Sequence, residues 1–253
     1  MPRNALNTRL EMQAAEPLYK QVERQILNCL AQGEWKPGDR LPTESQLAER
    51  FGVAVLTVRA GIRDLVETSI LVRKQGSGTY VARHDRQRRR YQFTHVFRND
   101  GTKITPERRL VSFTKVAADD ASAKYLQLRP GDRATLYRIE CLLKLEGRAV
   151  ALMDIMIPTR LFSGLTARAI EKSEENLYAV YQNACDVNVI RIKEQVHAVR
   201  AGGRAAKILG IPAADPALRI DRIAYTYNDV PVEFRRRVHS AADFHYELDE
   251  GGI

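Results

Sequence analysis

Two periodicities divide the chain. Over residues 16–82 apolar residues recur every three or four positions, which is typical of amphipathic helices, and from about Tyr91 they tend to alternate with polar residues, as in strands with one buried face. A first helix is predicted to begin at Pro17 and to end near Gly33. Its inward positions are expected to be Leu18, Val22, Ile26, Leu27 and Leu30.

Two further short helices are predicted within Leu41–Ala82. Thr43, followed three residues later by Gln46, is the pattern of a capping box, and Gly52 stands where a helix end favours a positive φ. The next helix follows a turn at Val53–Ala54, and its inward face is expected at Val58, Ile62, Leu65 and Val66. Two short helices joined by a tight turn form a helix-turn-helix, whose second helix enters the major groove of DNA.

A small hairpin is predicted directly after these helices. Its strands are Leu71–Lys74 and Thr79–Val81, and its loop contains Gly76 and Gly78. Glycine lets a backbone approach a phosphate closely, so the hairpin is interpreted as a wing. A helix pair or a glycine loop alone occurs in many proteins that never bind DNA, whereas the complete order of cap, helix, turn, helix and wing is far more specific.

This order resembles the N-terminal DNA-binding domain of GntR-family transcriptional regulators over residues 16–82. The matching positions are Pro17–Leu18–Tyr19, Pro37–Gly38, Leu41–Pro42–Thr43–Glu44, Leu47–Ala48, Phe51–Gly52, Thr57–Val58–Arg59 and Lys74–Val81. The resemblance implies DNA contacts from the start of the first groove helix, the start of the recognition helix and the wing. Transferred by motif, these are Arg40, Thr43, Glu44, Ser45, Ala54, Val55, Thr57, Arg59, Arg63, Gln75, Gly76, Ser77 and Gly78.

The chain departs from the family at two of these positions. Ser45 stands where an arginine is usual, and Ala54–Val55 stand where a Ser/Thr–Arg pair is usual. An arginine that bonds guanine through two hydrogen bonds is worth about 1–3 kcal/mol of discrimination, so the family's guanine-containing half-site is in doubt. Either Val55 contacts a thymine methyl group, or recognition shifts to Arg40, Arg59 and the wing. Arg59 is itself either a phosphate contact or a partner in an ion pair.

The second half of the chain predicts an α+β layer. Strands are predicted at Arg109–Val116, Thr135–Leu145, Ala149–Pro158, Asn188–Val199, Leu218–Asn228 and Val232–His239. Helices are predicted at Ala121–Leu126, Leu165–Lys172, Glu175–Ala184 and Arg204–Leu209.

An internal duplication is predicted in this half. Ala123–Leu128 and Ala206–Ile211 look alike at a separation of 83 residues, and each precedes a hairpin with a tight turn, at Leu145–Gly147 and at Asn228–Asp229. Two such helix–hairpin units side by side would form one antiparallel sheet backed by helices. A small cavity is expected where the two units meet.

This half resembles the effector-binding (UTRA) domain of the HutC subfamily, which shares its fold with chorismate lyase. The resemblance rests on the turn at 209–215, on Ile157–Pro158, on Asn176–Leu177–Tyr178 and on Pro231–Val232–Glu233. It implies a winged helix-turn-helix domain followed by a chorismate-lyase-like antiparallel sheet domain with helices. The expected boundaries are a flexible arm at 1–15, the DNA-binding domain at 16–82, a basic linker at 83–91 and the effector-binding and dimerisation domain at 92–253.

The resemblance also suggests where an effector binds. Relatives that bind sugar phosphates have arginines on the first hairpin and a glutamate on its return strand, where this chain has Cys141, Leu143 and Met153. A phosphate clamp needs cationic groups, so a phosphosugar effector is not expected. The other polar candidates are Asp154, Asn176, Tyr178, Glu233, Arg235, Arg237 and His239.

The last four of these residues share one face of a predicted strand. That face is either a solvated charged surface or the lining of the cavity. In the second case, one acidic and two basic groups together would suit a carboxylate or amino-acid-like ligand.

Composition narrows the class of protein. The chain has 253 residues and a formal net charge of +9, and residues 83–91 alone contain five arginines and one aspartate. That segment is a solvated linker that could also contact phosphates. No apolar run of about 18 residues and no apolar signal-peptide core is present, so a cytoplasmic protein is expected, associated with the nucleoid when bound to DNA. The cysteines, Cys29, Cys141 and Cys185, have no metal-ligand spacing, and no metal or cofactor is expected.

The preferred hypothesis is a bacterial transcriptional repressor. It would bind a roughly palindromic operator as a homodimer, and a small molecule in the second domain would change its affinity for DNA. Two alternatives are an enzyme related to chorismate lyase and a non-specific nucleoid-type DNA-binding protein. No catalytic residue is expected, because no nucleophile–base motif, metal spacing or phosphate loop is present and the five histidines are scattered.

Overall fold

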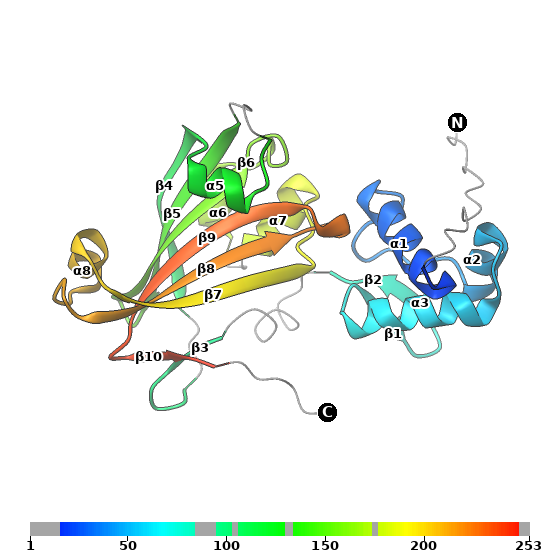
Figure 1. The fold of residues 1–253 in the computed structure, drawn as a ribbon, viewed down its shortest axis with the longest axis horizontal. Coiled ribbons are helices and arrows are strands. Elements are labelled where there is room, and N and C mark those ends of the chain that lie inside the picture. The colour runs from blue at the N-terminus through cyan, green and yellow to red at the C-terminus, as the bar shows by residue number, and fades with distance from the viewer. Residues whose placement is uncertain (1–15, 84–94, 103–105, 130–133, 174–176, 248–253) are drawn as a thin grey trace. The chain divides into compact units, whose positions relative to one another are not determined.

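The computed structural model describes residues 16–83, 95–102, 106–129, 134–173 and 177–247. These residues form two compact units, one within 16–83 and one within the remaining described chain (Figure 1). The arm predicted at 1–15 lies outside the described residues, as does the predicted linker after Arg83.

The first unit is a helix-turn-helix with a wing, as predicted. Thr43 and Gln46 form the predicted capping box, and Gly52 ends the helix with a φ of 69°. The two strands pair antiparallel from Leu71↔Val81 to Lys74↔Gly78. In chain order the elements are α1 (Leu18–Ala31), α2 (Glu44–Phe51), α3 (Val55–Glu67), β1 (Leu71–Lys74) and β2 (Gly78–Val81).

The core of this unit lies between the inward faces of the helices. Val22, Ile26, Val58 and Leu65 have no exposed surface. The expectation that Leu18 would be buried was wrong, because its side chain is 41% exposed. Residues four apart drift by about 40° per step around a helix, so a run of three such steps leaves the buried face at one end.

Close packing of α3 against α1 depends on Gly61. A Cβ atom built on this buried glycine would lie 2.9 Å from the backbone oxygen of Tyr19 and 3.2 Å from Cγ1 of Val22. The two helices can therefore approach only where α3 has no side chain. Lys20 adds an ion pair to Asp64 at 3.0 Å beside the same contact.

The second unit is built on one six-stranded antiparallel sheet. Its strand order is β4-β5-β6-β9-β8-β7, and β3 and β10 pair separately. The elements are β3 (Val96–Arg98), β4 (Glu107–Ala117), α5 (Asp120–Tyr125), β5 (Thr135–Leu145), β6 (Arg148–Pro158), α6 (Ala167–Lys172), α7 (Leu177–Cys185), β7 (Arg191–Arg200), α8 (Gly203–Leu209), β8 (Pro216–Tyr225), the 3-10 turn η1 (Tyr227–Asp229), β9 (Pro231–Ser240) and β10 (Phe244–Tyr246).

The strand order confirms the predicted duplication. The run β4-α5-β5-β6 is repeated as β7-α8-β8-β9, and the two copies meet along the β6–β9 pair. The two copies also end their helices in the same way, because Gln127 and Gly210 both adopt positive φ. The backbone amide of the next residue then donates to the carbonyl oxygen five residues earlier, from Leu128 to Ala123 at 2.9 Å and from Ile211 to Ala206 at 3.1 Å. Both hairpin turns contain two successive residues of positive φ, at Glu146–Gly147 and at Asn228–Asp229.

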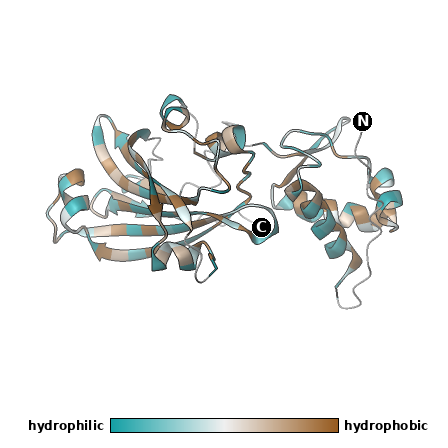
Figure 2. Ribbon diagram, turned by 90° about the horizontal axis from the view of Figure 1, so that it is seen from above, coloured by the Kyte–Doolittle hydropathy of each residue, from teal (hydrophilic) through white to brown (hydrophobic). Residues whose placement is uncertain are grey.

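Helices cover both faces of the sheet, and hydrophobic residues alternate with polar ones along most strands (Figure 2). Residues of α6 and α7 pack on Ile139 and Ile155 of one face. On the other face, Tyr125 of α5 stacks on Phe234 with ring centroids 4.4 Å apart, and α8 packs on Ala217. The sequence did not predict β3 and β10, because a three-residue strand is too short to show a period.

We expect Gly61→Ala to lower the free energy of unfolding of the first unit by about 1–3 kcal/mol, because the added methyl group meets backbone that cannot move freely. Trp35, the only tryptophan of the chain and buried in this unit, reports the transition by fluorescence during urea unfolding. Gly203→Ala is the matched control, followed by circular dichroism. No atom lies within 4 Å of its added carbon, so it should be neutral or stabilising. Equal effects of both substitutions would contradict the packing argument.

Candidate functional site

The outward surface of α3 is a stripe at helical spacing. Val58, Ile62 and Leu65 face the core, so residues 56, 59, 60 and 63 lie on the opposite side of the helix. Leu56, Arg59 and Arg63 are exposed, and Ala60 is half-buried between them. Ala54, the residue before the helix, provides no side-chain cap. Apart from the hydroxyl of the half-buried Thr57, the start of α3 therefore presents backbone and apolar groups, and its middle presents arginines.

Arg59 is held by an ion pair to the neighbouring helix. Its Nε donates to Glu44 at 2.8 Å, and Arg73 of the wing strand β1 donates to the other oxygen of the same carboxylate at 3.0 Å. Glu44 therefore links α2, α3 and the wing. Of the two roles expected for Arg59, the ion pair is present in the structure, and its phosphate contact stays a prediction.

The wing is shaped by its glycines and by Arg40. Gly76 and Gly78 have φ values of 70° and 116°, so a side chain at either position would be strained. A Cβ atom at Gly78 would lie 2.9 Å from Nε of Arg40, which places this guanidinium against the wing backbone. Arg40 also forms a backbone bridge with Tyr80.

Most of the predicted DNA-contact residues are exposed. The exposed ones are Arg40, Thr43, Ser45, Ala54, Arg59, Arg63, Gln75, Gly76, Ser77 and Gly78, and the half-buried ones are Glu44, Val55 and Thr57. Val55 is turned partly toward the core, whereas its neighbour Leu56, which was not among the predicted contacts, is 72% exposed. Leu56, Arg59, Ala60 and Arg63 stand at positions i, i+3, i+4 and i+7, and this helical spacing is the signal in the sequence that could have identified Leu56.

In the second unit, the candidate effector residues of β9 lie in a buried cluster of charges. Cross-strand register aligns Glu194 of β7, Arg222 of β8 and Arg235 of β9 in one row, and Tyr178 of α7 accepts a hydrogen bond from Arg222 at 3.3 Å. The neighbouring positions of the same face are Glu233, Arg237 and His239, which are 0%, 7% and 1% exposed. The possibility that this strand face is a solvated surface is therefore excluded.

Glu233 is the central acceptor of the cluster. Tyr181 and Arg235 donate to one of its oxygens at 2.8 and 2.7 Å, and Tyr178 donates to the other at 3.2 Å. The hydroxyls come from α7, so the carboxylate ties this helix to the sheet. Burial raises the pKa of both tyrosines, and the Glu233 charge raises them further, so both remain protonated donors.

Glu194 holds the other end of the cluster. Arg222 donates to it at 2.7 Å, Arg237 at 3.3 Å and Tyr246 of β10 at 2.5 Å. Burial opposes its charge, but the guanidinium groups of Arg222 and Arg237 outweigh burial and lower the pKa of Glu194 to about 2. The short strand β10 is thus fastened to the sheet through a carboxylate.

The cluster carries more positive than negative charge. Three arginines, at 222, 235 and 237, face the two carboxylates of Glu194 and Glu233. Burial, followed by the Arg237 charge, lowers the pKa of His239 to about 3, so this side chain is neutral at pH 7. Arg237 is the least compensated cation: burial and the nearby Arg222 lower its pKa to about 10, and its Nε has no hydrogen-bond partner among the described residues.

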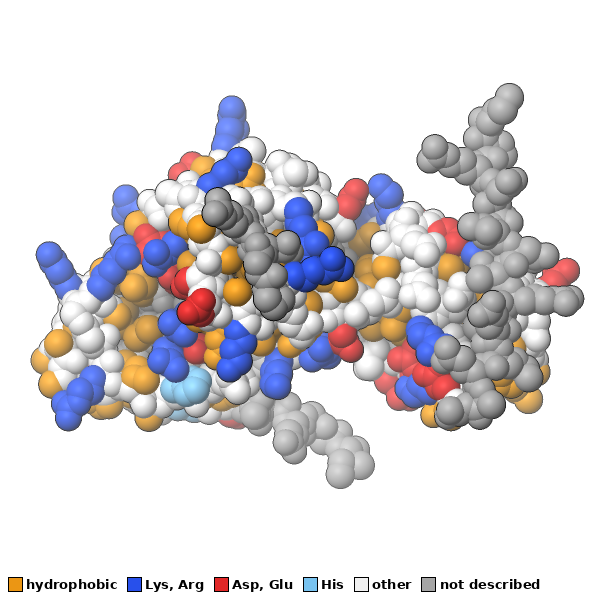
Figure 3. All heavy atoms as spheres, turned by 45° about the horizontal axis from the view of Figure 1, so that its top comes forward, with side chains coloured by type: hydrophobic (Ala, Val, Ile, Leu, Met, Phe, Trp, Pro, Cys, Tyr) orange, Lys and Arg blue, Asp and Glu red, His pale blue; other side chains and the backbone are white. Residues whose placement is uncertain are grey.

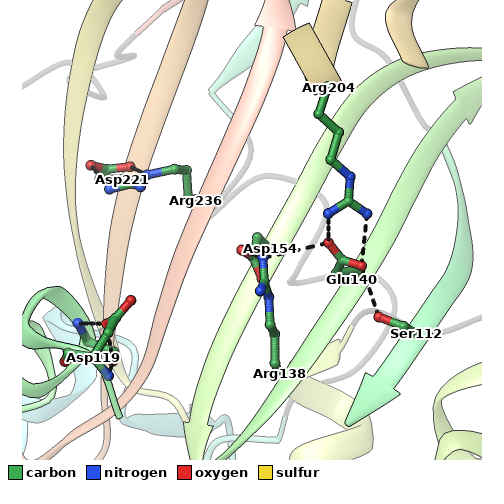
Figure 4. Close-up of polar contacts among 9 residues, drawn as sticks. Ser112, Asp119, Arg138, Glu140, Asp154, Arg204, Asp221 and Arg236 are labelled. Atoms are coloured by element: carbon green, nitrogen blue, oxygen red, sulfur yellow. Dashed lines mark hydrogen bonds and ion pairs between the residues drawn. The ribbon is translucent and has the colours of Figure 1, made fainter. Parts of the chain in front are cut away.

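The other candidate effector residues are placed differently. The structure does not bring Asp154 to this face: it lies on the opposite one, where Arg138 bonds both of its oxygens at 3.0 and 2.8 Å (Figure 4). The reason is strand alternation, since its neighbour Met153 faces the cluster side. Asn176 lies outside the described residues. Cys141 and Met153 are buried in the apolar core, with Leu143 packed at its edge.

The residues of the cluster do not line either of two hollows found in this unit. These hollows, of about 280 and 510 Å³, are lined by other parts of the unit: the first by residues around the β5–β6 turn and β10, the second by residues near Arg129 and Arg160. The charged groups of the cluster instead bond to one another. Sequence reasoning missed Glu194, Arg222, Tyr181 and Tyr246, because only pairing across β7, β8 and β9 shows that they share a site with Glu233.

Further observations on the described residues concern metal ligands, thiols and apolar helices. No group of three His, Cys, Asp or Glu in this part of the chain could hold a metal ion. Cys29 and Cys141 are buried and Cys185 is half-buried, and all three are free thiols. No helix in the described ranges is long and apolar enough to cross a membrane. On the visible face of the second unit, basic side chains are scattered among hydrophobic and acidic ones rather than gathered into one strip (Figure 3).

Two family models match the chain. The model described as "Bacterial regulatory proteins, gntR family" matches residues 18–81, and the model described as "UTRA domain" matches residues 102–245. The first match spans the helix-turn-helix and wing, and the second spans the six-stranded sheet.

Two named repressors match nearly the full chain, and a solved ligand-binding domain matches part of it. The mannosyl-D-glycerate transport/metabolism system repressor MngR of Escherichia coli (strain K12) is 29% identical over 234 residues, covering 92% of this chain and 95% of that protein. The HTH-type transcriptional repressor NagR of Bacillus subtilis (strain 168) is 26% identical, covering 91% and 93%. The ligand-binding domain of a putative GntR-family transcriptional regulator from Bordetella bronchiseptica is 29% identical with a TM-score of 0.57, covering 62% of this chain and 97% of that domain.

We expect Glu194→Gln to lower the free energy of unfolding of the second unit by about 3 kcal/mol at pH 7, because two buried arginines lose their shared carboxylate. The pKa of Glu194 is depressed in the folded protein, so its contribution is complete above the ordinary value of 4.5 and is lost as the pH falls toward about 2. Urea unfolding followed by circular dichroism should therefore show a smaller loss of stability on acidification for the variant than for the wild type. Glu171→Gln, at an exposed position of α6, should leave the acid dependence unchanged. Parallel pH profiles for wild type and Glu194→Gln would refute this role.

Proposed function

Because this chain belongs to the GntR family of bacterial regulatory proteins, in the HutC subfamily that carries a UTRA domain, we propose that it acts as a homodimeric repressor whose effector is a small anion. The chain is a DNA-binding transcriptional regulator, and a small molecule bound by its second unit modulates operator binding. The domain boundaries, the dimer, the contact residues and the class of effector are the proposed parts.

The outward stripe of α3 and the wing support the assignment of the DNA-contact surface. In a winged helix-turn-helix, the second helix of the motif lies in the major groove and the wing lies beside the sugar-phosphate backbone. Thr57 and Arg59 lie in the first turns of α3, and Gly76 and Gly78 lie at the tip of the wing. A homodimer would place two such surfaces on half-sites about one helical turn apart, which gives a roughly palindromic operator.

The buried cluster supports an anionic effector, and the incompletely compensated Arg237 is the observation that carries this proposal. A buried cation without a full set of partners is unfavourable, and a ligand carboxylate would supply the missing charge and hydrogen-bond acceptors. Cys141 and Leu143 occupy the positions where phosphosugar-binding relatives have arginines, so a carboxylate fits better than a sugar phosphate. The name of the relative MngR, a mannosyl-D-glycerate system repressor, also favours a carboxylate effector, because a glycerate carries a carboxylate.

The proposed mechanism is thermodynamic linkage. If the effector and the operator favour different arrangements of the dimer, each weakens the binding of the other by the same factor. Glu233 and Glu194 are suited to transmit effector binding, because they connect the cluster to α7 and to β10. An anion that competes with either carboxylate for its arginines would loosen these contacts.

The two alternative functions have less support. The named relatives are repressors, which favours regulation over an enzymatic role. A non-specific nucleoid-type protein would bind any duplex through phosphates, and its binding would collapse with salt. Sequence preference at high salt separates it from a repressor.

We expect the purified protein to prefer the DNA upstream of its own gene over a scrambled duplex by about a thousandfold in a gel-shift assay at the higher of two salt concentrations. Thr57→Ala combined with Arg59→Ala should abolish this preference without unfolding the protein, because both residues lie at the proposed groove surface. The control variant Arg24→Ala removes an exposed arginine from α1 and should keep the preference for the upstream duplex. Specific binding by the double variant would refute the groove assignment, and equal binding of both duplexes by the wild type would refute specific repression.

For the effector, we expect thermal-shift screening of small carboxylates, each paired with its neutral amide or alcohol, to select only charged compounds. D-glycerate and glycerol form one such pair. Arg237→Met should weaken a selected carboxylate at least about tenfold, since a hydrogen bond to a charged group is worth about 1.5–3 kcal/mol, and should leave DNA binding intact. Arg236→Met is the matched control, because Arg236 lies next in β9 but on the opposite face, paired with Asp221. A neutral effector, or unchanged affinity in Arg237→Met, would contradict the proposal.

A further inference from the structure

Leu56 is the most exposed of the large hydrophobic side chains in the described chain. Its exposure is 72%, against 39–50% for the other four. A single exposed leucine is common on protein surfaces and by itself needs no explanation. Its position is what matters, because it begins the outward stripe that continues through Arg59, Ala60 and Arg63.

The geometry of α3 aims Leu56 away from the core. It lies two residues before Val58, which has no exposed surface, and two residues correspond to about 200° around the helix. Leu56 is therefore nearly opposite the buried face. Val55, one residue earlier, is half-buried and faces partly inward. If α3 enters the major groove, Leu56 is the apolar side chain that enters with it.

Within residues 55–58, the half-buried Thr57 carries the only side-chain hydroxyl, and Leu56 is the most exposed side chain. Arg59 is held by Glu44 at 2.8 Å, and Ala54 and Ala60 carry only methyl groups. The major groove contains one apolar group, the 5-methyl of thymine, and the other base edges there present hydrogen-bond donors and acceptors. Placing a leucine against those polar edges would remove them from water without a partner, which is unfavourable.

We propose that Leu56 contacts thymine 5-methyl groups in the major groove and so selects thymine within each operator half-site. This inference rests on the proposed DNA-binding function of α3. It replaces Val55 with Leu56 as the residue for this contact, and it provides one sequence-dependent contact where arginines at 45 and 55 are absent. Burial of one methyl group corresponds to about 0.8 kcal/mol, or roughly fourfold in affinity.

The test removes single methyl groups from the DNA. A preferred duplex is first obtained, from the upstream region or by selection from random sequences. Each thymine of one half-site is then replaced in turn by deoxyuridine, which lacks only the 5-methyl group and keeps every hydrogen-bonding group. Wild-type protein should lose about threefold to fivefold in affinity at one or two positions.

The decisive comparison is a double-mutant cycle with Leu56→Ala. This variant should bind the unmodified duplex more weakly and should show no further loss at those deoxyuridine positions, because the two groups that touch have both been removed. Leu18→Ala, a leucine of α1 that is 41% exposed, should keep the full loss. Circular dichroism verifies that the variants fold, which the exposure of both side chains favours.

Three results would overturn the inference, and they differ in what they mean. If Leu56→Ala keeps the full deoxyuridine loss, another residue contacts the methyl group. If a preferred duplex exists but no deoxyuridine substitution lowers the affinity of the wild-type protein, the protein is a specific DNA-binding regulator that does not use methyl contacts. If no duplex is preferred, specific repression and this inference fail together, and that result comes from unmodified DNA alone.

Discussion

A carboxylate without exposed surface, that of Glu233, determines how the second unit is held together. Removing such a charge from water is unfavourable unless donors surround it, and here two tyrosines of α7 and Arg235 supply them. The need to satisfy Glu233 fixes where α7 can lie on the sheet. It also places Arg235 and its neighbours on the buried face, where their charges in turn require Glu194.

The duplicated topology makes this arrangement possible. Two copies of a strand–helix–hairpin unit meet along β6 and β9, so β9 is a central strand with a partner on each side. Such a strand is usually apolar on a covered face, and in the first copy the corresponding positions are indeed apolar, including Ile139 and Cys141 of β5 and Ile155 of β6. The second copy has charges instead. The asymmetry between the copies is consistent with the proposed ligand site, because buried ion pairs often stabilise a core no more than apolar residues of similar volume.

The first unit depends on a different constraint, the exclusion of a side chain at Gly61. With α1 and α3 in close contact there, the buried face of α3 is fixed, and its opposite face becomes the surface presented outward. Glu44 then orders the arginines around it, joining α2, α3 and β1 through Arg59 and Arg73. The first turn of α3 is apolar apart from Thr57, and Arg59 on the same surface is already paired with Glu44, although the chain carries a net charge of +9.

The sequence by itself determined most elements of both units. The capping box at Thr43, the left-handed Gly52 and the duplication at 83 residues all follow from local chemistry or from spacing, and the structure has each of them. Spacing also placed Glu233, Arg235, Arg237 and His239 on one strand face. It could not decide whether water or protein covers that face, because this depends on α7 and on strands far away in the chain. For the same reason only the tertiary structure decided that Asp154 faces away from the cluster, that Glu194 and Arg222 belong to it, and that Leu56 rather than Val55 lies outward on α3. The spacing of residues along a strand or helix fixes which side chains share a face, and long-range packing decides whether that face contacts water or protein.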